Sequence, residues 1–208
     1  MQSRIKKFYR REAEVIYPPV EIPNSKLQFP NKFQIPNSKG KYYLAGGRLA
    51  RAKRIDLAIE VCNRLKLPLK IYGRGFADYD SELKGMAGPT VEFMGEVSDE
   101  ELNKLYLGAK ALIYPSEQED FGIIPVEAQS YGVPVIGLNQ GGVKETVISR
   151  KTGVLFDEAT VESLIKAIKQ FNNLTIKPEN CIKNAQKFNK ERFKKEIKEF
   201  VYARTSRS

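Results

Sequence analysis

The sequence contains no histidine and only two cysteines among its 208 residues. Without histidine, the chain cannot form a serine–histidine triad or use imidazole as an acid, a base or a metal ligand. Two cysteines, Cys62 and Cys181, are too few for a zinc site of the usual kind. They lie far apart, each within a helical pattern. We therefore expect buried free thiols, which are typical of a reducing compartment such as the cytoplasm.

The sequence also lacks any apolar run near the roughly 18 residues of a membrane span. Its beginning, MQSRIKKFYRREAEV, contains no signal-peptide core. The net charge is +10, and basic residues gather at both ends, in residues 4–11 and 194–208. Such charge suits an anionic small ligand, nucleic acid or an anionic membrane surface, or is only a solvated helix face. Aromatic–basic motifs of RNA-binding modules are absent.

The distribution of proline and of apolar runs divides the chain into three parts. Residues 18–40 contain five prolines and predict an extended, unpacked lead-in. From residue 42 onward, short strand-like runs alternate with helical patterns. The predicted strands are 42–46, 69–73, 91–95, 111–115, 134–138 and 153–156. The alternation predicts an α/β fold with a doubly wound parallel sheet of about six strands, covered by helices on both faces.

We accordingly assign residues 1–40 to a linker, 41–175 to the α/β domain, and 176–208 to C-terminal helices and a basic tail. Sheets of this kind bind ligands in the crevice outside the carboxyl ends of their strands. The loops that follow the strands are therefore the places to look for chemistry.

The loop after the first predicted strand reads GGRLARAKRID, from Gly46 to Asp56. Gly46 and Gly47 permit a tight turn, and Arg48 and Lys53 precede a helix opened by Arg54. Basic side chains beside a helix N-terminus suit a diphosphate, because free N–H groups and the helix dipole add to the charge. The spacing of a phosphate-binding P-loop is absent. The alternative is a glycine turn with solvated bases.

The loop after the second predicted strand reads GRGFADYD and begins at Gly73. It lacks the third glycine of a dinucleotide fingerprint, which argues against a dehydrogenase. Asp78 and Asp80 have the spacing of a DxD metal signature. Their place just ahead of a helix instead favours an interaction with the helix dipole, and we expect no metal site.

The loop after the third predicted strand reads GEVSDEEL and begins at Gly95. Ser98 or Asp99 is a natural helix N-cap, and Glu101 lies close to the capping-box position. A contact from the backbone of residues 96–97 to a nucleobase is the other interpretation.

The loop after the fourth predicted strand leads into a helix, and the segment reads SEQEDFGIIPVEA. Two of its glutamates, Glu119 and Glu127, lie on either side of Phe121, Gly122 and Pro125. Pro125 suits the first turn of a helix, so Glu119 belongs to the loop and Glu127 to the helix. On one continuous helix they would lie about 12 Å apart along the axis. A loop-to-helix turn can bring both to the rim of one cleft, where free N–H groups around residues 121–124 meet an anion. We interpret them as two acids with different partners, not as an acid–base dyad; alternatively, Glu127 is a surface helix residue.

Together these loops resemble the retaining nucleotide-sugar glycosyltransferases of family 4, whose GT-B architecture pairs two Rossmann-like domains. The resemblance covers residues 15–175 and is to the C-terminal, donor-binding half. Its most specific part contains the E-x7-E motif and reads EDFGIIPVEAQSYGVPVIGLNQGGVKETV. The segments GRLARAK, YGRG and FMGEVSDEEL occur in the order and spacing of the family.

The resemblance implies a role for each candidate residue. Arg48 and Lys53 would hold the donor diphosphate, and Glu119 would hydrogen-bond the transferred sugar; these three form the catalytic set. Glu127 would bind the ribose. The remaining donor contacts would be Gly47, Gly73, Val97, Phe121, Gly122 and Ile123, several through backbone amides. The resemblance implies neither a metal nor another cofactor.

The resemblance also implies partners. The lead-in EVIYPPV is most similar to mannosyltransferases that use GDP-mannose. An acceptor-binding N-terminal domain should precede this chain, so we expect a fragment of a longer enzyme of polysaccharide biosynthesis, acting on a glycan or lipid-linked acceptor. The basic ends would meet that domain or a membrane surface. Two alternatives stay open: half of a nucleotide-sugar epimerase or another GT-B enzyme, and a nonenzymatic nucleotide- or nucleic-acid-binding domain.

Overall fold

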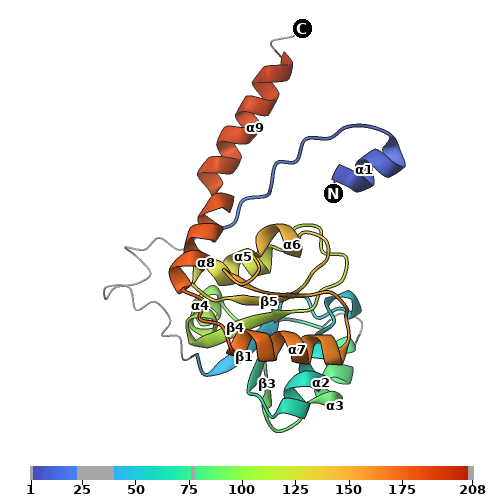
Figure 1. Cartoon of the computed structure of the whole chain (residues 1–208), viewed down its shortest axis with the longest axis vertical. Coiled ribbons are helices and arrows are strands. Elements are labelled where there is room, and N and C mark those ends of the chain that lie inside the picture. Colours follow the sequence, from blue (N-terminus) through green and yellow to red (C-terminus); the bar gives the residue numbers. More distant parts are fainter. Residues whose placement is uncertain (1, 23–39, 76–77, 206–208) are drawn as a thin grey trace.

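A computed structural model describes residues 2–22, 40–75 and 78–205 of the chain (Figure 1). Its strands are β1 Tyr42–Gly46, β2 Leu69–Tyr72, β3 Val91–Gly95, β4 Ala109–Tyr114, β5 Val135–Leu138 and β6 Gly153–Phe156. All neighbouring strands pair in parallel, in the order β3-β2-β1-β4-β5-β6. This is the strand order of doubly wound dinucleotide-binding sheets. The predicted fold class is confirmed.

Helices connect the strands and extend the chain beyond them. They are α1 Gln2–Tyr9, α2 Ile55–Leu65, α3 Tyr79–Met86, α4 Asp99–Gly108, α5 Ile123–Ser130, α6 Val143–Thr146, α7 Val161–Asn172, α8 Pro178–Ala185 and α9 Lys190–Thr205. Short 3-10 turns, at Arg51–Lys53 and Gln186–Phe188, precede α2 and α9. The predicted capping box of α4 is confirmed, since Ser98 accepts from the Glu101 amide and Glu101 accepts from the Ser98 amide.

Alternating side chains of the strands build a separate core on each face of the sheet. On β1, Tyr43 and Ala45 pack with α2, α3 and α7. Leu44, between them, packs on the opposite face with α4, α5 and α6. Figure 1 shows α2, α3 and α7 on one side of the strands and α5 and α6 on the other. The predicted covering of both faces is therefore confirmed, and the strand ends alone remain open to a ligand.

The boundary that differs most from the prediction lies at β4. This strand begins at Ala109, two residues before the predicted start. The reason is that Ala109 is both the C-cap of α4 and the first residue of the strand, so no loop separates the two elements. Gly108, the last residue of α4, is the one local mark of this transition.

The C-terminal region is joined to the α/β core by a buried polar network. The side-chain amide of Asn184 on α8 donates at 2.8 Å to both the Gln129 side chain and the Thr146 carbonyl. Gln129, on α5, donates in turn to the Thr146 and Pro125 carbonyls at 2.9 and 3.1 Å. Gln129 is fully buried and Asn184 nearly so. These bonds hold α8 against α5, the helix that follows the fourth predicted loop.

The prediction of an unpacked lead-in is wrong for its described part. Val20 is buried in a cluster with Phe121 and Phe188, and Tyr17 packs against both rings. The Arg192 guanidinium of α9 donates to the Tyr17 and Pro18 carbonyls. Prolines prevented a strand or helix here, but an extended chain can still bury alternate side chains. Residues 23–39 of the predicted lead-in lie outside the described residues.

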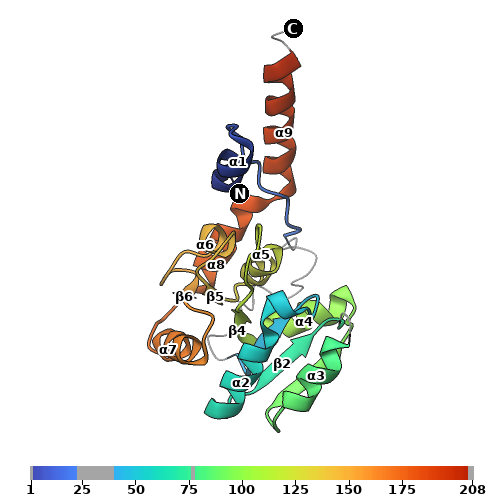
Figure 2. The ribbon, with the colours of Figure 1, turned by 90° about the vertical axis from the view of Figure 1, so that its right-hand side faces the viewer.

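Helices α1 and α9 stand away from the α/β domain. Figures 1 and 2 show α9 rising from α8 as one straight helix, with α1 beyond the body of the sheet. No side chain of α9 is buried, and Phe8 and Tyr9 of α1 are about three-quarters exposed, at 70% and 75%. Among the described residues, no helix combines the length and apolar character needed to cross a bilayer.

Both cysteines are free and fully buried, as the sequence predicts. Cys62 lies on α2 and Cys181 on α8. Burial raises the pKa of each thiol to about 12, so neither forms a reactive thiolate at neutral pH.

We expect Asn184→Ala to lower the free energy of unfolding by about 2–3 kcal/mol, because it leaves the buried Gln129 carbonyl oxygen without a donor. Urea denaturation measures this change. Asn180→Ala on the same helix is the matched control, since the Asn180 side chain forms no hydrogen bond with the described residues. Equal effects of the two substitutions would show that α8 is not held by this network.

Candidate functional site

Three glycines draw the loops at the carboxyl ends of the strands together. Gly47 and Gly73, which directly follow β1 and β2, have φ values of +106° and +116°. A Cβ on Gly73 would lie 1.8 Å from the Gly47 carbonyl oxygen, and one on Gly47 would lie 2.5 Å from the Ile124 side chain. The Gly73 amide donates to the Gly95 carbonyl at 2.7 Å. Backbone therefore replaces side chains along this edge, as a ligand that approaches closely requires.

A cavity of about 760 Å³ opens at this edge. Its lining brings together five residues that the sequence analysis names, Gly47, Arg48, Gly73, Glu96 and Val97, and adds Tyr72, Arg74, Gly75 and Leu102. The volume lies within the usual range for small-molecule sites, about 300–1,000 Å³. Arg48 and Arg74 are exposed, and neither pairs with any of the residues that the structure describes. The cavity thus has cationic side chains available for an anion.

Sequence reasoning missed Arg74. Its signal was present, because a basic residue stands between Gly73 and Gly75 at the end of a strand.

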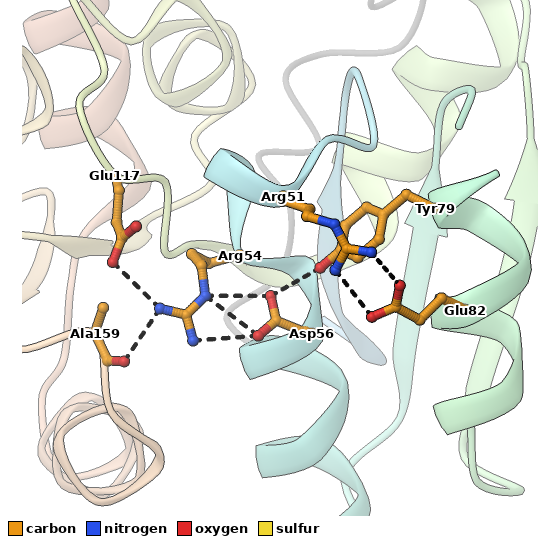
Figure 3. A network of polar contacts seen from close by, with 7 residues as sticks. All are labelled: Arg51, Arg54, Asp56, Tyr79, Glu82, Glu117 and Ala159. Carbon is orange, nitrogen blue, oxygen red and sulfur yellow. Dashed lines mark hydrogen bonds and ion pairs between the residues drawn. The ribbon is translucent and has the colours of Figure 1, made fainter. Parts of the chain in front are cut away.

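Two other arginines of the first loop hold the loop in place. The Arg51 guanidinium donates to both carboxylate oxygens of Glu82 on α3 and lies over the Tyr79 ring (Figure 3). Arg54 donates to Asp56, to Glu117 and to the Ala159 carbonyl. Figure 3 shows Arg54 between the loop after β4 and the start of α2. Because these charges are already paired, a ligand has less to gain from them than from Arg48.

Lys53 is directed toward the loop after β4, where it meets Glu119. Its ammonium lies 2.5 Å from Glu119 Oε2 and 3.4 Å from the Tyr114 hydroxyl. The same Glu119 oxygen accepts from Tyr114 at 2.6 Å and from Ser116 at 3.3 Å. The side chains of Lys53 and Glu119 are only 26% and 16% exposed. Sequence reasoning identified the ion pair's two members but missed Tyr114 and Ser116, since an aromatic strand end and a loop serine look ordinary.

Burial alone would raise the pKa of Glu119, but the bonds from Lys53, Tyr114 and Ser116 outweigh it and lower that pKa below its ordinary value. The carboxylate is thus ionised at neutral pH. Its partner cation makes the pair neutral as a whole.

The N-terminus of α5 faces the same edge without a side-chain cap. Gly122, at the N-cap, has φ of +87°, and no described side chain accepts from the first turn. Phe121 is buried and Ile123 is 44% exposed, so the chain leaves the core as the helix begins. Uncapped N–H groups at the start of a helix can donate hydrogen bonds to an anion. Their position agrees with the prediction from residues 121–124.

The loop after β5 packs against the segment from Glu119 to Phe121 that leads into α5. The Gly142 amide donates to the Glu119 carbonyl at 2.7 Å. A Cβ on Gly141 would lie 2.0 Å from that carbonyl oxygen, and one on Gly142 would lie 2.3 Å from the Phe121 Cα. Both glycines are therefore needed for the two loops to pack, a role that the sequence alone did not disclose.

Glu127 lies in the helix, as predicted, in an environment unlike that of Glu119. Together with Glu21, Asp99, Leu102, Asn103, Tyr106 and Tyr131 it lines a second cavity of about 210 Å³. Tyr106 donates to Glu127 Oε2 at 3.4 Å. Burial, chiefly, and the charge of Asp99 raise the pKa of Glu127 above its ordinary value, although the Tyr106 bond lowers it. The two glutamates have no bonding partner in common.

The acids of the second loop lie apart from these clusters. Asp80, in the first turn of α3, pairs with Lys84 at 3.5 Å. Asp78 is the N-cap of α3 and has φ of +58°, but its side chain forms no capping bond. Among the residues that the structure describes, no group of three or more acidic or cysteine side chains is arranged to hold a metal ion.

Known sequences resemble this chain over most of its length. Residues 28–188 match the family described as glycosyl transferases group 1. Alpha-1,3/1,6-mannosyltransferase ALG2 of Mus musculus is 29% identical over 228 residues, which cover 96% of this chain and 55% of ALG2. Glycogen synthase of Pseudomonas syringae pv. tomato is 28% identical over 156 residues, covering 71% of this chain and 32% of that enzyme. The chain thus spans about half or less of these relatives.

The fold also matches solved structures. Anabaena Alr3699/HepE, in complex with UDP and glucose, superposes with a TM-score of 0.69 at 21% identity, covering 85% of this chain and 51% of HepE. At such identity the superposition shows the fold. The match to the family extends over more than three-quarters of the chain and includes every loop described above. The chain therefore belongs to the glycosyl transferases group 1 family.

Proposed function

We propose that this chain is the donor-binding part of a retaining glycosyltransferase, and that it binds a nucleoside diphosphate hexose, namely GDP-mannose. One observation carries the proposal. A glycine-lined cavity at the ends of β1, β2 and β3 holds two arginines that pair with none of the described residues, and a Cβ on Gly47 in its lining would reach Ile124 in the uncapped first turn of α5. This arrangement offers positive charge and free N–H groups to one anionic ligand.

The diphosphate lies between Arg48 and the first turn of α5 in this proposal. Gly47 contacts the Ile124 side chain, so the loop that carries Arg48 lies next to that turn. As the sugar–phosphate bond breaks, negative charge grows on the leaving diphosphate. Each pre-aligned donor at such a charge contributes about two to three powers of ten in rate. Cationic residues already supply this stabilisation, and we propose that no metal is required.

Glu119 serves the transferred sugar in this proposal. Its Oε2 is already bonded to Lys53, Tyr114 and Ser116, and Oε1 accepts no bond from the described residues. That oxygen is available for a sugar hydroxyl. Lys53 keeps the carboxylate ionised and in place, and its ammonium contributes positive charge on the side of the leaving group. The chain offers no evident covalent nucleophile, so retention would follow from attack on the face that the diphosphate leaves.

The relatives support a hexose donor but differ in the sugar. ALG2 is named as a mannosyltransferase, the Pseudomonas relative as a glycogen synthase, and HepE was solved with UDP and glucose. We retain mannose because the ALG2 match covers nearly the whole chain. The acceptor, a glycan or lipid-linked glycan, would bind to a further domain that this chain does not supply. The basic helices α1 and α9 are the surfaces that we propose for that domain or for a membrane.

We expect Arg48→Ala to weaken GDP binding about 10-fold or more, as for the loss of one bond between charged groups. Isothermal calorimetry with GDP, UDP and ADP measures this change and the base preference. Arg51→Ala is the matched control from the same loop, and its effect should stay within about 2-fold because Arg51 is already paired with Glu82.

A chelator added to the same titration should leave the affinity unchanged. No binding of any of the three nucleotides at millimolar concentration would refute the site. Affinity that disappears with the metal would instead turn attention to Asp78 and Asp80, and UDP binding at least as tightly as GDP would refute only the choice of base.

We expect glutamine substitutions at the two glutamates to change apo stability in opposite directions at pH 7. Glu119 has a lowered pKa, so its charge stabilises the fold above the unfolded pKa, and this contribution is lost as pH falls through the folded pKa. Glu119→Gln should therefore lower the unfolding free energy by about 1–2 kcal/mol, since it leaves Lys53 without its carboxylate.

Glu127 has a raised pKa, so its charge destabilises the fold at pH values above the folded pKa. Glu127→Gln should therefore raise the unfolding free energy while it weakens nucleotide binding. Urea denaturation at pH 7 and pH 4 measures both variants, and the two differences should shrink at the lower pH. Equal signs at pH 7 would contradict the assignment of different environments to the two acids.

A further inference from the structure

We propose that Tyr106, supported by Tyr72, is a positioning residue that holds Oε2 of Glu127 and leaves Oε1 free for the ribose hydroxyls of the nucleotide. This inference rests on the proposed function, because it assumes that Glu127 meets a nucleotide. It adds two tyrosines from different elements, β2 and α4, to a site that the sequence described through its glutamates and bases.

The three groups form a chain of hydroxyls that ends on the carboxylate. The Tyr72 and Tyr106 hydroxyls lie 3.0 Å apart, and Tyr106 donates to Glu127 Oε2 at 3.4 Å. Each phenol has a single proton. When the Tyr106 proton points to Glu127, Tyr72 must donate to the Tyr106 oxygen. The order of donation is thereby fixed from β2 through α4 to α5.

The rings are rigidly held, so the chain of bonds has one geometry. Tyr106 is 1% exposed and Tyr72 is 6% exposed. The Tyr106 ring stacks on Tyr131 at 5.2 Å and meets the Tyr72 ring edge-on at 6.3 Å. Phenylalanine at either position would fill the same space in this apolar core. A buried hydroxyl without a hydrogen-bond partner would lower the stability of the fold. We therefore assign the two hydroxyls the role of orienting Glu127.

The chain of bonds also connects the two cavities of the site. Tyr72 lines the 760 Å³ cavity and Tyr106 lines the 210 Å³ cavity, where Glu127 lies, and Leu102 lines both. Glu127 Oε1 accepts no hydrogen bond from the residues that the structure describes. A diol, with two adjacent hydroxyl donors, matches a carboxylate oxygen held at the border of two such cavities. The bond of 3.4 Å is long, and ligand binding can shorten it.

The charged groups that face Glu127 are acidic, so the bond from Tyr106 is what favours the ionised form of this carboxylate. Asp99 of α4 and Glu21 of the lead-in line the same cavity, and the hydroxyl of Tyr131 donates to Asn103. No cation of the described residues pairs with Glu127. Burial and Asp99 raise its pKa, and the Tyr106 bond opposes them. Without that bond the carboxylate takes up a proton at higher pH and becomes a weaker, uncharged acceptor.

The test compares GDP with 2′-deoxy-GDP by calorimetry between pH 5.5 and 8.5, using the wild type, Tyr106→Phe, Tyr72→Phe and Glu127→Ala. Tyr42→Phe is the matched control, because Tyr42 packs on the same apolar cluster but its hydroxyl donates to the Leu105 carbonyl of α4, and Tyr42 lines neither cavity. Thermal unfolding of each variant verifies that it is folded. If UDP binds more tightly than GDP, UDP and 2′-deoxy-UDP replace the pair.

Tyr106→Phe should weaken GDP binding about 10-fold at pH 7 but 2′-deoxy-GDP binding less than about 2-fold, the size expected for one bond to a charged group. The pH below which GDP affinity falls should move upward. Tyr72→Phe should change the GDP affinity and the pH at which it falls in the same directions by smaller amounts, and Tyr42→Phe should change neither.

Two results would overturn the inference while leaving the proposed function intact. One is a Tyr106→Phe variant with the wild-type preference for GDP over 2′-deoxy-GDP and an unchanged pH profile, while Glu127→Ala loses that preference. The other is an equal loss for both nucleotides, which would assign Tyr106 a purely structural role. Failure of the wild type to bind any nucleotide, by contrast, would refute the proposed function itself.

Discussion

The ion pair between Lys53 and Glu119 spans the point where the order of the strands reverses, and the rest of the site is arranged around it. Lys53 comes from the loop after β1 and Glu119 from the loop after β4, neighbouring strands whose connections lead to opposite faces of the sheet. A backbone bond from the Glu117 amide to the Ala52 carbonyl, 2.9 Å long, closes the same two loops. This junction lies directly ahead of the first residues of α2 and α5, Ile55 and Ile123. From it the support continues outward, because the Glu119 carbonyl accepts from Gly142 and the Thr146 carbonyl, at the end of α6, accepts from Asn184.

The two glutamates of the E-x7-E motif show how one short segment can hold two acids whose pKa values are shifted in opposite directions. Glu119 receives an ammonium and two hydroxyls on one oxygen, which favours the charged form. Glu127 receives a single long bond in a buried cavity that other acids line, which disfavours it. Environments that separate the pKa values of two acids indicate different tasks for them. The separation is consistent with a sugar contact for the first and a ribose contact for the second.

The first loop likewise divides its basic residues between structure and ligand. Arg51 and Arg54 are paired with Glu82, Asp56 and Glu117, whereas Arg48 remains at the cavity without a partner among the described residues. The sequence shows four basic residues within seven positions and gives no means to rank them. Apart from Asp56, which neighbours Arg54 in the chain, their partners come from α3 and from the loop after β4, so only the fold distinguishes the basic residues that are paired from those that are available.

The sequence by itself determined the architecture and the edge of the sheet at which the candidate site lies. Alternating short strands and helices allow one economical solution, a parallel sheet covered on both faces, and parallel strands place all following loops at one edge. Local signals also located Glu119 in the loop, Glu127 in the helix and the capping box of α4, because these depend on neighbours within a few residues. Tertiary structure decided the rest. The bond of Glu127 to Tyr106, the polar tie of α8 to α5, and the burial of Val20 against Phe121 each join residues far apart in the chain. Such contacts depend on distances across the packed fold, on which spacing along the sequence carries no information.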